Sequence, residues 1–286
     1  MTFDQFCRAL GLIVDRVEVG RWVRVPTVDH PRTRNGAYKF LGDIGWAQNH
    51  ATQVDVATWR PDESTPNTNR EAIAKKAAEF EAKRVQGWER AARRAADLAA
   101  TATPKPHAYL MNKGFTDTPG LVLQDDVLLI PMNHWKSNRL VGAQLIRWLP
   151  EERRFEKKML PGMRAKGAVF RMGSARAPRT WLVEGFATGL SVEAALRVLR
   201  LRDSVTVCFS DGNLVHVASQ IATPAIVFSD NDESGAGLRA AERTGLPYCM
   251  SPVVGFDAND MHKHEGIFTV ASLMLGATQL QREPVS

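Results

Sequence analysis

The sequence of 286 residues has few cysteines, few tyrosines and no long apolar run. Cys7, Cys208 and Cys249 are its only cysteines and lie far apart, so the sequence predicts neither a disulfide framework nor a zinc ribbon. No segment approaches the roughly 20 apolar residues that a membrane-spanning helix needs. The first residues mix acidic and basic side chains and lack a cleavable signal pattern. We therefore expect a protein of the reducing cytoplasm with no membrane partner.

A phosphate-binding loop of the form G-x-x-x-x-G-K-[ST] is also absent, which excludes a fused ATP-driven helicase. Positive charge, in contrast, is in excess: 37 Lys and Arg residues against 31 Asp and Glu give a net charge of +6. Residues 151–180 hold nine of these cations against three acids. This excess suits a polyanionic partner, and a solvated face is the alternative interpretation.

Hydrophobic periodicity divides the chain into four predicted segments. Residues 1–66 form an N-terminal β-rich module, and residues 67–103 form a long connecting helix rich in Ala, Lys, Glu and Arg. Residues 104–178 form a basic α+β subdomain. Residues 179–286 alternate between strand and helix patterns, which predicts a small parallel α/β sheet flanked by helices. We expect strands at 180–183, 204–209, 225–229 and 248–250, and helices at 187–201, 214–221 and 233–244.

Two apolar, β-branched runs in the last segment end abruptly in acidic residues. The first run, WLVEG, ends at Glu184, and the second, AIVFSDND, ends at Asp230 and Asp232. Ligands of open α/β sheets bind beyond the carboxyl ends of the parallel strands, so we expect these three carboxylates to converge. Such a site suits Mg²⁺ or Mn²⁺. A surface loop is the alternative interpretation of a single D-x-D pattern.

Small residues follow both acidic motifs. Gly185 permits a tight turn into the next helix, and Thr188 can cap that helix or contact a substrate. Ser234 opens the run SGAG, which lets the following helix begin close to the site with its N-terminal N–H groups near a bound phosphate. We predict that these three residues contact the substrate.

The order of these motifs resembles the Toprim domain, the catalytic module shared by bacterial-type primases, topoisomerases and some nucleases. VEGFATGLS, VFSDND and GFDANDM carry the resemblance. It implies that Glu184, Asp230 and Asp232 hold the metal ions of nucleotidyl transfer. It also implies that Asp257 and Asp260 are auxiliary metal ligands or structural acids. An Asx turn with a helix cap is the alternative interpretation of those two residues.

Upstream, HAYLMNKG, LLIPM, VGAQLI and KKMLPG resemble the region that precedes this domain in primases of plasmids, phages and mobile elements. The likeness covers roughly residues 104–270. It implies that Lys158, with its neighbour Lys157, contacts substrate phosphate or the template backbone. Arg164 is a weaker candidate, and a simple surface lysine is the alternative interpretation of Lys158.

The N-terminal segment departs from that family. Residues 23–49 resemble the outline of a zinc ribbon, but the cysteine ligands are absent, so we expect a β module without zinc. Basic and aromatic residues alternate there, as expected for contact with single-stranded nucleic acid, although the aromatic rings can equally form a small core. The residues concerned are Arg21, Arg24, Arg32, Arg34, Tyr38, Lys39 and Trp46.

Together these features predict a DNA primase, a template-directed, Mg²⁺- or Mn²⁺-dependent nucleotidyltransferase. It would make short primers from nucleoside triphosphates on single-stranded DNA, with a separate replicative helicase as a candidate partner. Three tyrosines in a short chain argue against a covalent DNA–tyrosine mechanism. Two alternatives remain open: a Toprim nuclease in which the same acids activate water, and a non-catalytic nucleic-acid-binding accessory protein of replication.

Overall fold

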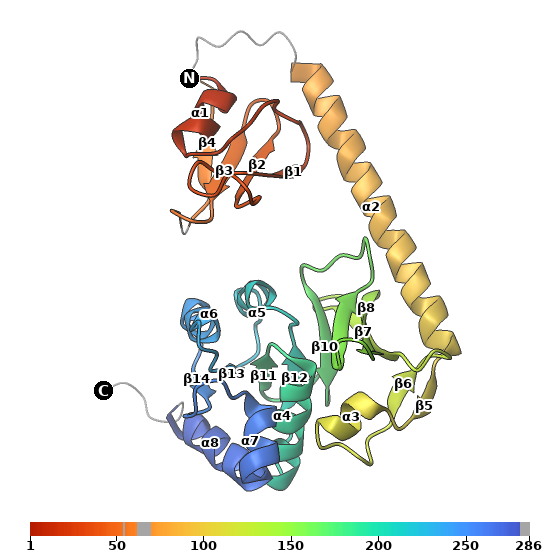
Figure 1. Ribbon diagram of the computed structural model, residues 1–286. Helices are drawn as coiled ribbons and strands as arrows, with labels where there is room; N and C mark the ends of the chain where they lie inside the picture. Colours follow the sequence, from red (N-terminus) through yellow and green to blue (C-terminus); the bar gives the residue numbers. More distant parts are fainter. Residues whose placement is uncertain (54, 62–69, 281–286) are drawn as a thin grey trace. The chain divides into compact units, whose positions relative to one another are not determined.

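The computed structural model describes residues 1–53, 55–61 and 70–280, and it divides into two compact units, Met1–Gly87 and Trp88–Ser286 (Figure 1). Helix α2 (Arg70–Thr101) contributes residues to both units. Among the helices of the described ranges, none combines the length and apolarity required to cross a membrane.

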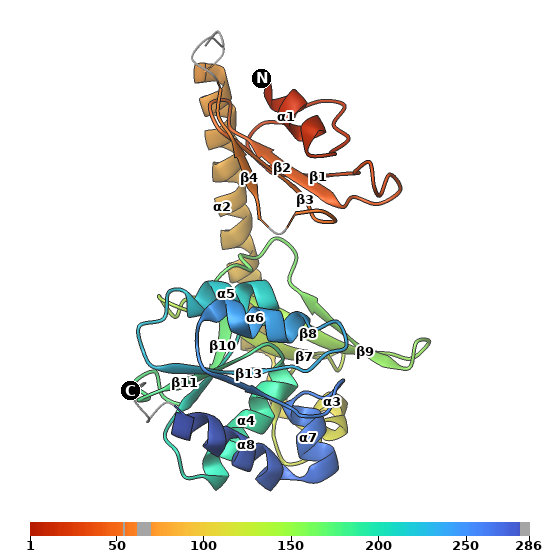
Figure 2. The ribbon, with the colours of Figure 1, turned by 90° about the vertical axis from the view of Figure 1, so that its left-hand side faces the viewer.

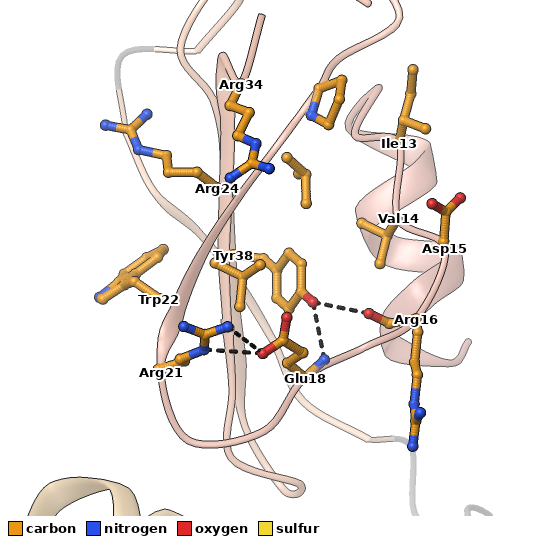
Figure 3. A pocket seen from close by; sticks show the side chains of 13 residues that line it. Ile13, Val14, Asp15, Arg16, Glu18, Arg21, Trp22, Arg24, Arg34 and Tyr38 are labelled. Carbon is orange, nitrogen blue, oxygen red and sulfur yellow. Dashed lines mark hydrogen bonds and ion pairs between the residues drawn. The ribbon is translucent and has the colours of Figure 1, made fainter. Parts of the chain in front are cut away.

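The N-terminal unit is a four-stranded antiparallel sheet with one short helix, α1 (Phe3–Ala9). Its core gathers Phe3, Cys7 and Tyr38 around Trp59. Tyr38 is fully buried, and its Oη accepts a hydrogen bond from the backbone N–H of Glu18 (3.0 Å) and donates to the carbonyl of Arg16 (3.1 Å; Figure 3). Tyr38 is therefore a core residue, as the alternative interpretation held. The strands, in sheet order, are β1 (Trp22–Val25), β2 (Gly36–Phe40), β3 (Gly45–Asn49) and β4 (Ala57–Trp59).

Helix α2 lies within the segment 67–103 for which a long helix was predicted. The stretch is rich in strong helix formers and lacks proline, so the helix continues for 32 residues. In the C-terminal unit it buries Ala91 and Ala95 in a cluster with Leu129 and Met132. The small alanine side chains let the helix lie close to the sheet there.

The C-terminal unit is built on one ten-stranded mixed sheet. Strands β14, β13, β11 and β12 are adjacent and parallel, and β10 pairs antiparallel with both β12 and β7. The sheet thus continues from the predicted α+β subdomain into the predicted parallel segment. Its strands are β5 (Thr103–Lys105), β6 (Gly120–Val122), β7 (Leu128–His134), β8 (Leu140–Leu149), β9 (Arg154–Met159), β10 (Ala168–Met172), β11 (Thr180–Val183), β12 (Ser204–Val207), β13 (Ala225–Ser229) and β14 (Tyr248–Met250).

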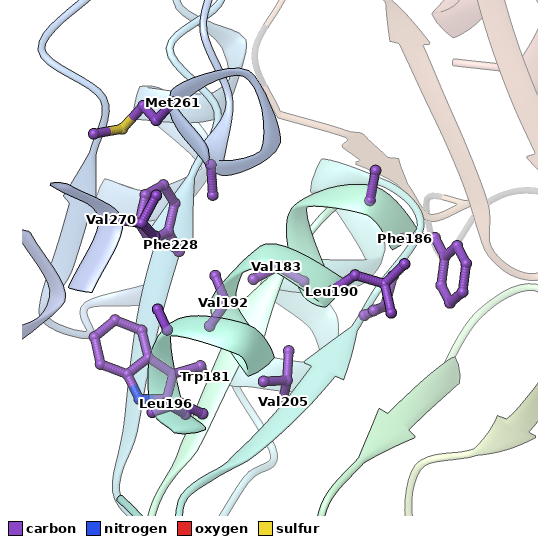
Figure 4. Close-up of a cluster of buried hydrophobic side chains, with 14 of the residues drawn as sticks. Trp181, Val183, Phe186, Leu190, Val192, Leu196, Val205, Phe228, Met261 and Val270 are labelled. Carbon is purple, nitrogen blue, oxygen red and sulfur yellow. The ribbon is translucent and has the colours of Figure 1, made fainter. Parts of the chain in front are cut away.

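Helices cover both faces of the parallel strands (Figures 1 and 2). Side chains alternate between the faces along each strand. Trp181 and Val183 therefore pack under α4, α7 and α8 (Figure 4), whereas Leu182 packs under α5 and α6. The helices are α3 (Ala108–Asn112), α4 (Phe186–Val198), α5 (Asp211–Ala218), α6 (Ala236–Thr244), α7 (Ala258–Glu265) and α8 (Ile267–Leu280).

Several predicted boundaries were wrong. Helix α5 begins at Asp211 instead of 214, because Ser210 caps it. Helix α6 begins at Ala236 instead of 233, since Gly235 in the left-handed region (φ 67°) ends a turn just before it. Helices α7 and α8 were not among the predicted helices.

Candidate active site

Acidic residues follow three neighbouring parallel strands of the C-terminal unit. Glu184 follows β11, Asp211 follows β12, and Asp230 and Asp232 follow β13. Because β12, β11 and β13 are adjacent and parallel, their carboxyl ends meet at one edge of the sheet. The structure therefore places the three predicted carboxylates at the same edge and adds a fourth.

The backbone after β12 is held against the backbone of Glu184. Cys208 N–H donates to the carbonyl of Val183 (2.8 Å), and Phe209 N–H donates to the carbonyl of Glu184 (2.9 Å). Phe209 adopts a φ of 65°, a left-handed conformation that is costly for an aromatic residue. This bend ends the strand and places Asp211, the first residue of α5, beside the Glu184 side chain.

The backbone of Asp230 packs closely against the start of α6. A Cβ atom on Gly237 would come within 2.2 Å of the Asp230 carbonyl oxygen, so only glycine lets the start of α6 pass this close. Next to it, the side-chain amide of Asn231 donates to the carbonyl of Ser251 (2.9 Å) and anchors the loop. One carboxylate oxygen of Asp230, Oδ1, is buried without a hydrogen-bond partner.

The Asp232 side chain forms hydrogen bonds at the start of α6. Its carboxylate accepts hydrogen bonds from Ser234 Oγ and from the backbone N–H groups of Ala236 (3.3 Å) and Gly237 (2.9 Å). These bonds, led by the one from Ser234, hold its pKa well below its usual range. Two N–H groups that were expected near a bound phosphate are thus already engaged, and Ser234 contacts Asp232.

Glu184 and Asp230 show the opposite electrostatic behaviour. Burial, the hydrogen bond to Asp211 and repulsion by Asp211, Asp230 and Asp232 raise the pKa of Glu184 to about 8. Burial first, and then repulsion led by Asp257, raises the pKa of Asp230 to about 7. Removing carboxylates from water and crowding them together disfavours their charged form. Without a cation, Glu184 is therefore largely protonated at neutral pH, and Asp230 is protonated in a substantial fraction of molecules.

Asp257 and Asp260 form a capping box at the start of α7. Asp257 Oδ1 accepts from Asp260 N–H (2.8 Å), and Asp260 Oδ2 accepts from Asp257 N–H (3.3 Å). The other oxygen of Asp257 accepts from Thr188 Oγ1 (2.9 Å), and Thr188 is fully buried. Gly185 caps α4, where a Cβ would lie 3.0 Å from the same hydroxyl. The helix-cap interpretation accounts for both aspartates, and their charges still reach Asp230.

The predicted basic residues lie on strand β9 and the loop after it. Lys158 is 72% exposed and forms an ion pair with Glu156 (2.7 Å). The Lys157 ammonium lies 5.4 Å from the centre of the Tyr109 ring, and the Arg164 guanidinium lies 5.3 Å from that of Trp88. The largest charge effects on Glu184 and Asp230 come from acids, so these cations have no demonstrated contact with the acidic edge.

The carboxylate oxygens of this edge are the kind of ligand that a hard divalent cation prefers. In the described ranges, no three His, Cys, Asp or Glu side chains converge closely enough to hold a metal ion. Two observations nevertheless fit Mg²⁺ or Mn²⁺: the buried, unpartnered Oδ1 of Asp230 and the mutual repulsion of Glu184, Asp211 and Asp230. Carboxylates with several retained waters are the usual Mg²⁺ environment, so this edge needs only a few direct ligands.

Asp211 was missed by sequence reasoning although the signal was present. The run SVTVCFSD is also an apolar strand that ends in an acid, as at Glu184 and Asp230. Placing the following helix three residues too late hid it. Asn213 was missed as well: this buried side chain accepts from Gly167 N–H (2.7 Å) and donates to the carbonyls of Ala168 and Cys208 (both 2.8 Å). It joins α5 to the loop before β10.

Comparisons with known proteins add little. No protein-family model matches the chain, and no curated protein matches it in sequence. A solved structure of the DnaG catalytic core aligns over 74% of this chain and 74% of its own, with a TM-score of 0.38 and 14% identity. A TM-score this low does not establish a common fold. The function must therefore be argued from the acidic edge itself.

Proposed function

We propose that this protein is a Toprim-type DNA primase whose catalytic centre is the acidic edge of the C-terminal unit. The observation that carries the proposal is the gathering of Glu184, Asp211 and Asp230 at the ends of adjacent parallel strands, where burial and repulsion raise the pKa of Glu184 and Asp230. Carboxylates whose pKa values are raised by burial and by neighbouring negative charge are typical of functional sites.

Glu184 and Asp230 would hold Mg²⁺ or Mn²⁺, giving up their protons as the cation binds. A bound divalent ion would neutralise charge on the reacting phosphate and orient the attacking 3′-hydroxyl. Asp211 lies beside Glu184 and would add a third negative charge to the site. Asp232 stays ionised, adds negative charge and holds the start of α6 in place.

The substrates would be nucleoside triphosphates and a single-stranded DNA template. Lys158 is exposed and forms an ion pair with Glu156, and it could exchange that partner for a phosphate. The Lys157 ammonium lies over the ring of Tyr109, and the Arg164 guanidinium lies over the ring of Trp88. Neither ring carries a charge that would neutralise these cations. A separate replicative helicase that opens duplex DNA would be a partner of this activity.

A primer-synthesis assay tests the proposal. The full chain is incubated with single-stranded templates, labelled NTPs or dNTPs, and Mg²⁺ or Mn²⁺. Asp230→Asn keeps the shape of the side chain and removes its charge. We expect synthesis to fall roughly 100-fold or more, because even outer-shell partners of a metal ligand are worth 10–100-fold. The matched control is Asp125→Asn, an exposed turn residue, which should leave synthesis unchanged.

The same preparation separates the alternatives. Metal-dependent cleavage of labelled DNA without any synthesis, abolished by Asp230→Asn, would identify a nuclease. The accessory-protein alternative draws support from one observation: Asp232 and Asp257 are both occupied in capping helices. Absence of synthesis, of cleavage and of calorimetric Mg²⁺ or Mn²⁺ binding would establish it and end the primase proposal.

A further inference from the structure

A buried asparagine links the acidic edge to the loop that precedes β10. Asn213 lies in the first turn of α5, two residues after Asp211, and it is only 9% exposed. Its Oδ1 accepts a hydrogen bond from the backbone N–H of Gly167 (2.7 Å), and its Nδ2 donates to the carbonyls of Ala168 and Cys208 (both 2.8 Å). One side chain therefore joins the start of α5 to the end of β12 and to the start of β10.

Strand pairing places this loop at the acidic edge. β10 runs antiparallel to β12, with Phe170 opposite Val207, so the amino end of β10 lies at the carboxyl end of β12. The acidic residues follow the carboxyl ends of β12 and of its parallel neighbours. Residues 163–167, which we call the basic loop because they include Arg164 and Lys166, therefore enter the sheet at the edge where the acids leave it.

The cations of the basic loop lie beside α5. Burial, and then repulsion led by Lys166 and Arg164, lowers the pKa of His216, which belongs to the same helix as Asp211. Charges at the surface are largely screened from one another beyond about 10 Å at 0.1 M salt, so both cations lie near this helix. α5 thus has acids at its start and cations along its side.

We propose that Asn213 is a positioning residue, which holds the basic loop at a fixed spacing from the acidic edge. A phosphate-bearing anion on a divalent ion at the acids would then meet Arg164 and Lys166 in one arrangement. This role rests on the proposed function for the metal ion, and it belongs to a residue that touches neither metal nor substrate. Displacing a functional group by about 1 Å can cost about 100-fold in activity, so such a residue affects function without contact.

The hydrogen bonds at this position require an amide side chain. The Gly167 N–H needs an acceptor, whereas the carbonyls of Ala168 and Cys208 need donors, and an amide supplies both. Aspartate would place a carboxylate against the two carbonyls, and leucine would remove all three hydrogen bonds. The basic loop is also held from its other side, because the Gly167 carbonyl accepts from Trp135 N–H (2.9 Å). The end of the loop therefore has one position relative to α5.

A double-mutant cycle tests whether Asn213 acts through the basic loop. The probe is inorganic tripolyphosphate, whose binding to the full chain is measured by calorimetry in saturating Mg²⁺. Asn213→Ala should weaken binding about tenfold, the lower end for residues that support metal ligands. In a background of Arg164→Ala with Lys166→Ala, the same substitution should change affinity by less than about twofold, because the groups that it positions are gone. A purely structural asparagine would cost the same factor in both backgrounds.

Two further measurements report on the hydrogen bonds and on stability. Hydrogen exchange at the Gly167 amide should accelerate in Asn213→Ala, because that amide loses its acceptor. Asn49→Ala is the matched control: Asn49 is 1% exposed, and its amide forms hydrogen bonds within the N-terminal unit. This control should lower the melting temperature yet leave the affinity for tripolyphosphate unchanged. If Asn213→Ala does not fold, Asn213→Ser, which keeps a donor and an acceptor, replaces it in the cycle.

Three results would overturn this role: no binding of tripolyphosphate to the wild type in Mg²⁺, unchanged affinity in Asn213→Ala, or an equal loss in both backgrounds. Asp230→Asn separates this role from the proposed function. A non-additive cycle, with binding that depends on Asp230 but no primer synthesis, would support the role of Asn213 and exclude the primase. Primer synthesis together with an additive cycle would keep the proposed function and exclude a positioning role for Asn213.

Discussion

The two units of this protein use charge in opposite ways. In the C-terminal unit, buried strands carry carboxylates into a crowded edge, where the pKa of Glu184 and of Asp230 rises to about 8 and about 7. In the N-terminal unit, Arg24 and Arg34 stay in water around an open cavity. Buried charge is costly and persists only where something compensates for it, whereas exposed charge costs little. The acidic edge is therefore the stronger indication of a reacting centre, since exposed arginines need no function to persist.

The largest expected effect tests the crowding at the acidic edge. Gly237→Ala would place a methyl group 2.2 Å from the carbonyl oxygen of Asp230. Because backbone must move to relieve it, we expect a loss of about 3 kcal/mol, the upper end of overpacking costs. Chemical denaturation followed by circular dichroism measures it. In the control, Gly276→Ala in α8, a Cβ meets nothing within 4 Å, so the gain in helix propensity should stabilise by about 0.5–1 kcal/mol.

A fall in stability of similar size in both variants, or none in Gly237→Ala, would show that the start of α6 is not packed against Asp230 as described.

The next effect is a pH dependence that follows from the raised pKa values of the acidic edge. The ordinary values for Glu184 and Asp230 are 4.5 and 3.8, and folding raises both pKa values. Their folded forms bind protons more tightly, so their contribution to stability is complete below pH 4 and disappears as pH rises through about 7 and 8. The metal-free protein should lose several degrees of melting temperature between pH 5 and 8.5, since 1 kcal/mol corresponds to about 2–4 °C in a domain of this size.

Calorimetry with and without Mg²⁺ measures this dependence. Magnesium should reverse the loss at pH 8, because it stabilises the ionised carboxylates, and Asp230→Asn should weaken both the loss and its reversal. Asp232 contributes in the other direction: its lowered pKa stabilises above pH 3.8, and that contribution is lost only in strong acid. A melting temperature that rises steadily from pH 5 to 8.5 would contradict the assignment.

These effects also show what could be predicted from the sequence. The strands ending at Val183 and Ser229 are apolar and bounded by acid and glycine, so their position and the meeting of Glu184 with Asp230 were predictable. Asp211 followed the same rule and was still missed, because the cap at Ser210 and the left-handed Phe209 are decided by contacts with the neighbouring strand. Local patterns do not contain such contacts.

Side-chain partners were less predictable than positions. Asp232 and Asp257 look alike in the sequence, as acids beside small residues, yet each is bound to the start of a helix that only the folded chain places there. In the N-terminal unit, Tyr38 and Trp22 are both aromatic residues in basic strands. The pairing of β1 with β2 buries the first and leaves the second at the surface. Alternation predicts two faces of a strand but does not say which one is covered.

A smaller effect is expected in the N-terminal unit. Tyr38→Phe removes the hydroxyl that bridges Arg16 and Glu18 and leaves the Glu18 N–H without its partner. Unmet buried hydrogen bonds cost about 1–3 kcal/mol, and partial access of water at Glu18 favours the lower end, about 1 kcal/mol. Hydrogen exchange of amides in β1 and β2 should report the loss, while amides of β11 and β13 in the other unit should be unchanged.

The smallest effect is expected at Lys158. Its ammonium is largely in water and its ion pair with Glu156 is exposed on the lysine side, so Lys158→Ala should change the free energy of unfolding by no more than about 0.5 kcal/mol. If Lys158 exchanges Glu156 for a phosphate, the same variant should raise the KM for nucleoside triphosphates or weaken template binding while its fold stays intact. Glu156→Gln is the matched control: it frees the lysine, so affinity for phosphate should increase or stay constant. Loss of affinity in both variants would mean that the pair itself, and not the lysine charge, shapes this strand.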